Sequence, residues 1–184
     1  MKYVSASAAY TFQRLGLSPK VDLPFEERLH LQKEILKDSD ALYERSGVRF
    51  ITDRTPIDFL AHLLADVQCE NVPRSAWGEV ERYMKDCFAC ANRHFTTVIL
   101  VQPGIKLVEA PTSAPANPSY IEHLSNLMLG LMANGMLECD HYQIPRACTD
   151  LDQRVAAVSQ ALRKSSSRHV AKMEAMHETG LVLH

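Results

Sequence analysis

Short apolar runs separated by long helical segments are the feature that most constrains the fold of this chain. Residues 48–52 form one such run, and residues 96–101, with the sequence TTVILV, form the clearest strand candidate. The first run is apolar enough to be a strand buried on both faces, as in a parallel sheet. Strands that alternate with helices predict a helix-rich α/β fold, with a small parallel sheet flanked by helices.

Helical spacing of apolar residues and turn signals give the other expected elements. Residues 3–5 are a short strand or the start of a helix. A helical stretch follows to Leu15, because Gly16 suits a helix stop. We expect further helices at 22–43, 56–67, 77–94, 119–136 and 149–164, and a short strand at 141–144. Residues 106–118 contain three prolines and form the most lid-like loop.

Length and charge limit the domain organisation and the class of partner. With 184 residues, we predict one domain over residues 1–164 and a basic, partly helical C-terminal extension over 165–184. A net charge of -2 argues against a general nucleic-acid or membrane surface. No apolar run reaches the roughly 18–20 residues that cross a bilayer, and no secretion signal is evident. Five cysteines without framework spacing favour a reducing, cytoplasmic location.

A carboxylate and a guanidinium follow the first predicted long strand. Asp53 and Arg54 lie at its carboxyl end, and Gln102 lies at the end of the strand over 96–101. Ligands of parallel α/β sheets bind at the carboxyl ends of strands, so these residues are candidates for a binding site. The alternative is structural: the pair would start the helix at Pro56, capped by Thr55, with an ion pair to a neighbour.

The run FITDRTPIDFLAHLLAD, residues 50–66, resembles the segment after the third strand of P-loop nucleoside and nucleotide kinases. More narrowly, it resembles the AAA-type ATP-binding kinase-like proteins of bacteriophages and bacteria. Other segments are similar in the same order: 3–8 to the second strand, 23–36 to the following helix, 98–107 to the strand before the lid, and 142–158 to the last strand and helix. The most distinctive motif is DRTPID.

The resemblance implies transfer of a phosphoryl group from ATP, with Mg²⁺, to a nucleoside, nucleotide or related acceptor. It implies that Asp53 contacts the acceptor hydroxyl or the metal shell, and that Arg54 contacts the acceptor or a phosphate. We expect Thr55, Gln102 and Lys106 to complete the substrate-binding set. Such catalysis depends on positioning and on cations that stabilise the phosphoryl oxygens, which an arginine fork does well.

The phosphate-binding motif G-x-x-x-x-G-K-[ST] is absent from the sequence. In the family it follows the first strand, which lies in the middle of the sheet and precedes the region matching Tyr3. A shortened relative, a rearranged fold or a second subunit would each account for this, and Lys106 is the only cation of the lid-like loop. The alternatives are a non-catalytic binding or regulatory protein built on a degenerate kinase fold, or an α-rich domain in which DRTP only starts a helix.

The segment CFACANRH places Cys87, Cys90 and His94 on one helix face. These side chains could ligate zinc, with a fourth ligand from Cys139, His141 or Cys148. Cysteines in mid-helix are more often buried apolar residues, and a redox Cys-x-x-Cys belongs at a helix start, so we predict no metal site.

Two further segments bear on partners. The helix over 119–136 is rich in Met and Leu, which favours a core face or a surface for a homo-oligomer or protein partner. The last helical region is basic, which is typical of a solvated helix end and linker or of a contact with phosphate or nucleic acid; its basic residues are Arg163, Lys164, Arg168 and His169.

Overall fold

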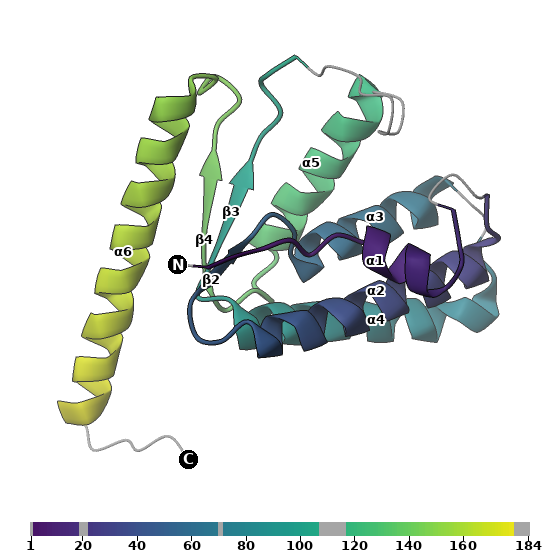
Figure 1. Ribbon diagram of the computed structural model, residues 1–184, viewed down its shortest axis with the longest axis horizontal. Helices are drawn as coiled ribbons and strands as arrows, with labels where there is room; N and C mark the ends of the chain where they lie inside the picture. The colour runs from purple at the N-terminus through teal and green to yellow at the C-terminus, as the bar shows by residue number, and fades with distance from the viewer. Residues whose placement is uncertain (1, 19–21, 70–71, 107–116, 179–184) are drawn as a thin grey trace. The chain divides into compact units, whose positions relative to one another are not determined.

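A computed structural model describes residues 2–18, 22–69, 72–106 and 117–178 (Figure 1). Its elements, in chain order, are β1 (Lys2–Val4), α1 (Ala9–Arg14), α2 (Phe25–Arg45), β2 (Phe50–Thr52), α3 (Pro56–Cys69), α4 (Arg74–His94), β3 (Thr97–Val101), α5 (Pro118–Ala133), β4 (Asp140–Ile144) and α6 (Leu151–Glu178). The chain forms two compact units, Met1–Phe95 with Leu107–Glu138, and Thr96–Lys106 with Cys139–His184.

The strands pair in parallel, two by two. β1 pairs with β2, with Lys2 opposite Phe50, and β3 pairs with β4, with Thr97 opposite Asp140 and Val101 opposite Ile144. Within the described ranges the strands form these two sheets and not a single one. The expectation of a helix-rich α/β protein with parallel strands is confirmed at this level.

The predicted strand over residues 48–52 is shorter and less buried than expected. β2 covers three residues, the side chain of Val48 is fully exposed, and Ile51 is 48% exposed. One face of β2 is covered, because the ring of Phe50 stacks on Tyr43 of α2 and meets Phe95 edge-on. A sheet of two short strands is covered here on one side only, so the prediction of burial on both faces is wrong.

The core of the first unit is built around α3. This helix packs against α2, α4 and α5, and α2 also packs against α4 (Figure 1). Leu60, Ala61 and Leu63 of α3 are almost completely buried, since a helix with neighbours on several sides is apolar on most of its surface. Tyr43 of α2 and Tyr83 of α4 contribute the largest buried rings.

Two glycines follow helix ends. Gly16 follows the last turn of α1 with φ 67°, as the sequence predicted, and Gly135 follows α5 with φ 81°, one residue before the predicted end at 136. These left-handed backbone conformations close a helix and favour glycine.

In the second unit, α6 packs on β3 and β4 (Figure 1). The hydroxyl of Thr97 donates to Ser165 Oγ at 2.7 Å, and Arg168 pairs with Asp140 at 3.3 Å. α6 continues without interruption to Glu178, whereas we expected a helix ending at residue 164. The predicted boundary between residues 164 and 165 therefore falls inside a helix.

Two expectations remain without structural description. Residues 107–116 of the lid-like loop and the end of the extension, 179–184, lie outside the described residues. Among the helices that are described, none combines the length and the apolar character that a bilayer crossing requires.

Gly104 lies against the backbone of Arg146, and this gives a test of the packing in the second unit. A Cβ atom at Gly104 would lie 2.0 Å from the carbonyl oxygen of Arg146, whereas a Cβ at Gly78 on α4 meets no atom within 4 Å. We predict that Gly104→Ala lowers the free energy of unfolding by about 1–3 kcal/mol. Gly78→Ala should raise it by about 0.5–1 kcal/mol. Urea unfolding followed by circular dichroism measures both, and equal effects of the two variants would contradict the described loop.

Candidate functional site

The residues after β2 form the first candidate site. Asp53 and Arg54 are both exposed and directly follow the strand. The guanidinium of Arg54, whose side chain is 49% exposed, lies 3.7 Å from the carboxylate of Asp58, one helical turn further on. Arg54 therefore has a weak internal partner and a large solvent-facing surface, and the side chain of Asp53 faces solvent.

The hydrogen bonds between Thr55 and Asp58 show that part of this motif has a structural role. The backbone N–H and the hydroxyl of Thr55 both donate to Asp58 Oδ2, each at 2.9 Å. The backbone N–H of Asp58 donates to the carbonyl of Thr55 at 3.0 Å. This is one half of a capping box, in which an acid at the third helical position reaches back to the cap residue. The predicted start of a helix at Pro56 is confirmed, and the carboxylate of Asp58 accepts the hydrogen bonds that cap it.

The buried phenol of Tyr43 hydrogen-bonds to the backbone of the same segment. The hydroxyl of Tyr43 donates to the carbonyl oxygen of Arg54 at 3.0 Å, and burial raises the pKa of Tyr43 well above its usual value. The phenol thus stays protonated and remains a donor at physiological pH. The position of Arg54 is therefore fixed at its backbone while its side chain stays exposed.

His62 lies further along α3, and the charges of Arg54 and Asp58 both act on its pKa. Burial lowers the pKa of His62, the Arg54 cation lowers it further, and Asp58 acts in the opposite direction. His62 Nδ1 lies 3.2 Å from the hydroxyl of Tyr120 on α5. A neutral histidine is thus part of the surroundings of the Arg54 side chain.

Gln102 and Lys106, the other predicted binding residues, belong to the second unit. The side-chain carbonyl of Gln102 accepts from the backbone N–H of Arg146 at 3.3 Å, and its backbone N–H donates to the carbonyl of Ile144 at 3.0 Å. Gln102 therefore links the segments that follow β3 and β4. Lys106 is exposed. The structure brings Asp53, Arg54 and Thr55 together in the first unit and places Gln102 and Lys106 in the other.

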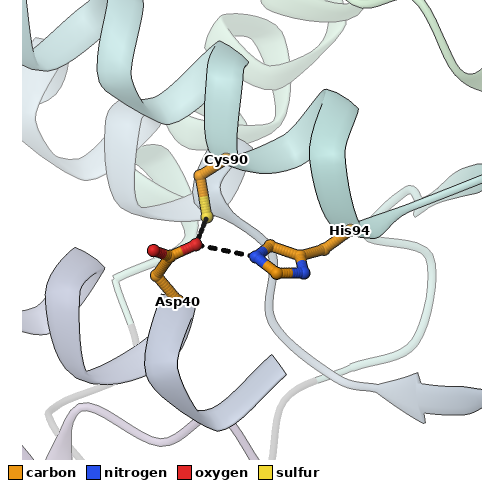
Figure 2. A group of neighbouring side chains, drawn as sticks. All are labelled: Asp40, Cys90 and His94. Atoms are coloured by element: carbon orange, nitrogen blue, oxygen red, sulfur yellow. Dashed lines mark hydrogen bonds and ion pairs between the residues drawn. The ribbon is translucent and has the colours of Figure 1, made fainter. Parts of the chain in front are cut away.

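A second polar cluster joins α2 to α4 (Figure 2). The thiol of Cys90 donates to Asp40 Oδ1 at 3.3 Å, and His94 Nε2 lies 2.7 Å from the same oxygen. Arg93 adds contacts of 3.3 and 3.4 Å to the two oxygens of Asp40. A carboxylate, a thiol and an imidazole therefore converge on one point of the α2–α4 interface.

The pKa values of Cys90 and Asp40 in this cluster shift in opposite directions. Burial raises the pKa of the Cys90 thiol and so does the Asp40 carboxylate, so the sulfur carries its proton. For Asp40, burial acts to raise the pKa, but hydrogen bonds from His94 and Cys90 and the charge of Arg93 outweigh it and leave the pKa lowered. The side chain of His94 is only 9% exposed.

Sequence reasoning found two members of this cluster and missed the third. It grouped Cys87 with Cys90 and His94, but Cys87 hydrogen-bonds with Tyr83 and burial raises its pKa to about 12. Asp40 lies 50 residues before Cys90 along the chain, so no local sequence spacing predicts their contact. Only the packing of α2 on α4 brings it there.

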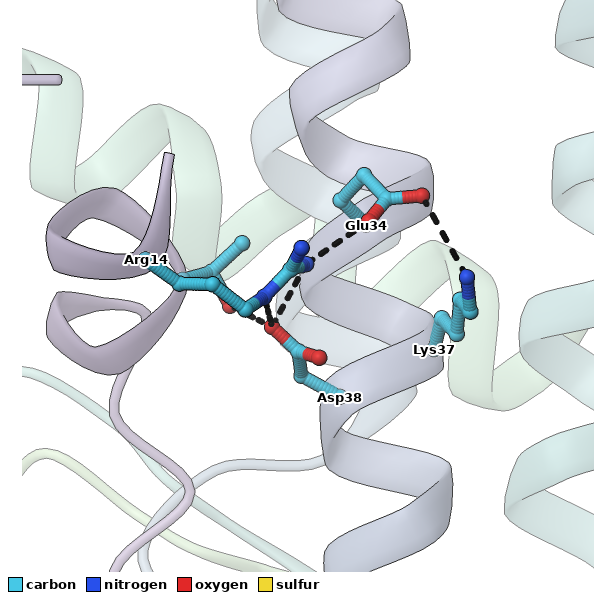
Figure 3. A network of polar contacts seen from close by, with 5 residues as sticks. Arg14, Glu34, Lys37 and Asp38 are labelled. Atoms are coloured by element: carbon cyan, nitrogen blue, oxygen red, sulfur yellow. Dashed lines mark hydrogen bonds and ion pairs between the residues drawn. The ribbon is translucent and has the colours of Figure 1, made fainter. Parts of the chain in front are cut away.

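The charged cluster between α1 and α2 has a different character (Figure 3). Arg14 lies 2.7 Å from Glu34 and 2.9 Å from Asp38, and the hydroxyl of Thr11 donates to Asp38 at 2.8 Å. Lys37 reaches Glu34 at 3.9 Å. The hydrogen bond from Arg14 lowers the pKa of Glu34. These groups satisfy one another, so the cluster fastens α1 to α2 and is not a candidate site.

Comparison with protein-family models, with curated proteins and with solved structures finds no match to this chain. The function therefore has to be argued from the residues and their geometry.

The cap at the start of α3 can be separated from the neighbouring exposed acid. Asp58→Ala removes the acceptor of both Thr55 bonds, so we predict a loss of about 0.5–2 kcal/mol in the free energy of unfolding. The matched change Asp53→Ala removes an exposed carboxylate and should stay within about 0.5 kcal/mol of the parent chain. Chemical denaturation of the two variants measures both losses. A larger loss for Asp53→Ala than for Asp58→Ala would contradict the assignment of the cap to Asp58.

His62 predicts a pH dependence of stability. Its folded pKa lies below the value of about 6.5 expected in the unfolded chain, so the unfolded state binds more protons between the two values. The stability contributed by neutral His62 is present above about pH 6.5 and is lost as the pH falls through the folded pKa. We predict that the parent chain loses more stability than His62→Gln between about pH 7.5 and about pH 5. Thermal unfolding at both pH values measures this, and parallel losses would contradict it.

Proposed function

We propose that this chain is a P-loop-kinase-like α/β protein that provides the acceptor side of phosphoryl transfer to a nucleoside, nucleotide or related small molecule. The acceptor would bind at the carboxyl end of β2, where Asp53 and Arg54 are exposed. The family resemblance of residues 50–66 suggested these residues, and the pairing of the strands supports them.

The strand pairing is the observation that carries the proposal. By the resemblance, β1 and β2 correspond to the second and third strands of the kinase-like sheet, β3 to the strand before the lid, and β4 to the last strand. The observed pairs are β1 with β2 and β3 with β4, all parallel. Both pairs are parallel, as neighbouring strands of a kinase-like sheet are expected to be. In that family the middle strand leads to the phosphate loop, and the sequence contains no G-x-x-x-x-G-K-[ST].

The local geometry at the end of β2 is suited to an anionic or hydroxyl-bearing ligand. An exposed ion pair such as Arg54 with Asp58, at 3.7 Å, contributes only about 0–1 kcal/mol, so a phosphate can replace the carboxylate at little cost. Arginine binds phosphate with two parallel hydrogen bonds, which is stronger than a distant surface pair. Asp53 is free to accept a hydrogen bond from a ligand hydroxyl, because Asp58 and not Asp53 caps α3.

The role of ATP follows from the missing motif. A phosphate cradle of backbone N–H groups and a lysine normally holds the β- and γ-phosphates together with Mg²⁺. This sequence has no such motif, so we assign the acceptor side to the chain and not the ATP site. Transfer of the phosphoryl group would need a cradle supplied by other residues.

The second candidate function is a non-catalytic binding or regulatory protein built on a degenerate kinase fold. The absence of the phosphate motif favours it, as does the capping role of Thr55, one of the predicted binding residues. In that case the residues after β2 only start α3, and the partner is a protein.

Isothermal titration calorimetry with nucleosides, nucleoside monophosphates and Mg-ATP distinguishes the two. We predict saturable binding of one acceptor class and none of Mg-ATP alone. Arg54→Ala should weaken acceptor binding by roughly ten- to hundredfold, the value of a hydrogen bond to a charged group, without loss of helical circular dichroism. Arg49→Ala, at an exposed arginine just before β2, is the matched control and should bind like the parent chain.

Absence of binding with every nucleoside and nucleoside monophosphate would contradict the proposal and favour a non-catalytic regulatory protein. Equal affinities of the Arg54→Ala and Arg49→Ala variants would show that the ligand binds elsewhere.

A further inference from the structure

The cluster of Asp40, Cys90 and His94 offers a thiol, an imidazole and a carboxylate oxygen from two helices, and their ligand atoms all lie within 4.8 Å of one another (Figure 2). We propose that these three side chains bind a divalent transition metal, with zinc as the best match, at the interface of α2 and α4. This site is independent of the proposed acceptor site at the end of β2.

The helix geometry supports the arrangement. Cys90 and His94 are four residues apart on α4, so their side chains project from the same face one turn apart. Asp40 faces them from α2 and touches both, as the two dashed contacts to one carboxylate oxygen in Figure 2 show. No loop has to reorganise to bring the three donors together, because the packing of the two helices already holds them.

The distances are close to those of a metal site. With bonds of about 2.0–2.3 Å at tetrahedral angles, donor atoms lie roughly 3.3–3.8 Å apart. The sulfur of Cys90 is 3.3 Å from Asp40 Oδ1, which fits, while His94 Nε2 is 2.7 Å from it and has to move outward by roughly 0.6–0.8 Å. A small rotation of the imidazole or the carboxylate is enough.

Neighbouring groups would orient the ligands. Arg93 contacts both oxygens of Asp40, so it can keep Oδ2 while Oδ1 turns to the metal. The ring of Tyr43 packs against the imidazole of His94 with centroids 5.6 Å apart. Outer contacts of this kind fix ligand rotamers, and they commonly contribute one to two orders of magnitude in metal affinity.

The site would also keep one coordination position open. A surface pocket of about 310 Å³ is lined by Asp40 and Cys90, together with Arg93, Lys33 and Lys37. Three protein ligands and a fourth position filled by water or an exogenous anion are typical of reactive zinc sites, whereas structural sites use four protein ligands.

The donor set selects the metal. Thiolate and imidazole suit zinc and its spectroscopic substitute Co²⁺, whereas Mg²⁺ and Ca²⁺ prefer oxygen ligands alone. On binding, the Cys90 thiol releases its proton to solvent and the sulfur becomes an anionic ligand. Without metal the same three groups form a hydrogen-bonded contact between the helices, so the site is compatible with the fold in both states.

The test is titration of the reduced, chelator-treated 184-residue chain with Co²⁺, followed by Zn²⁺. We expect one equivalent of Co²⁺ to produce a thiolate-to-cobalt charge-transfer band in the near ultraviolet, and Zn²⁺ to remove it. Asp40→Asn, Cys90→Ser and His94→Gln should each weaken binding at least about a hundredfold, since loss of a ligand costs no less than loss of an outer contact. The control is Cys87→Ala, at a buried cysteine of the same helix outside the cluster, which should bind like the parent chain.

A second readout separates metal binding from folding. Zn²⁺ should raise the thermal midpoint of the parent chain and of Cys87→Ala but not that of Asp40→Asn, because a ligand that binds only the folded state stabilises it. Absence of the charge-transfer band in the parent chain overturns the proposal. A band that persists in all three ligand variants also overturns it, because the metal then sits on other cysteines.

Discussion

The packing of α3 against α2, α4 and α5 is the interaction on which the rest of the first unit depends. Leu60 and Leu63 are completely buried, and burial of each such side chain stabilises the fold by roughly 1.5–3 kcal/mol. Because α3 is fixed on several sides, its first turn presents Thr55 and the exposed Arg54 at a defined place. The same packing holds α2 beside α4, which brings Asp40 to Cys90 and His94. Both the proposed acceptor site and the proposed metal site are therefore consequences of one helical core.

The sequence predicted those features that are local in origin. The strand TTVILV appears as β3 over Thr97–Val101, with its start shifted by one residue, because β-branched residues and a Gln-Pro-Gly stop act within a few positions. The start of α3 at Pro56 was predictable for the same reason, since proline at the first helical position and a nearby acid are sequence signals. Parallel pairing followed from strands alternating with helices.

Features set by distant contacts could not be predicted in the same way. The burial of β2 depends on which elements cover its faces, and only the Tyr43 side is covered, which leaves Ile51 half exposed. α6 passes residue 164 although that region is polar, and Ser165 and Arg168 there contact Thr97 of β3 and Asp140 of β4. The contact of Asp40 with Cys90 joins residues 50 positions apart. Of the predicted binding residues, Gln102 has its side chain engaged with the backbone of Arg146, a role that its place after a strand does not reveal.

Residue-resolved NMR of the parent chain during titration with nucleoside monophosphates tests the proposed acceptor site at the end of β2. We predict that amide shifts concentrate at residues 52–55 and that the signals of Asp40, Cys90 and His94 remain unchanged until a metal is added. Shifts confined to other parts of the chain, or no shifts at saturating ligand, would contradict an acceptor site at the end of β2.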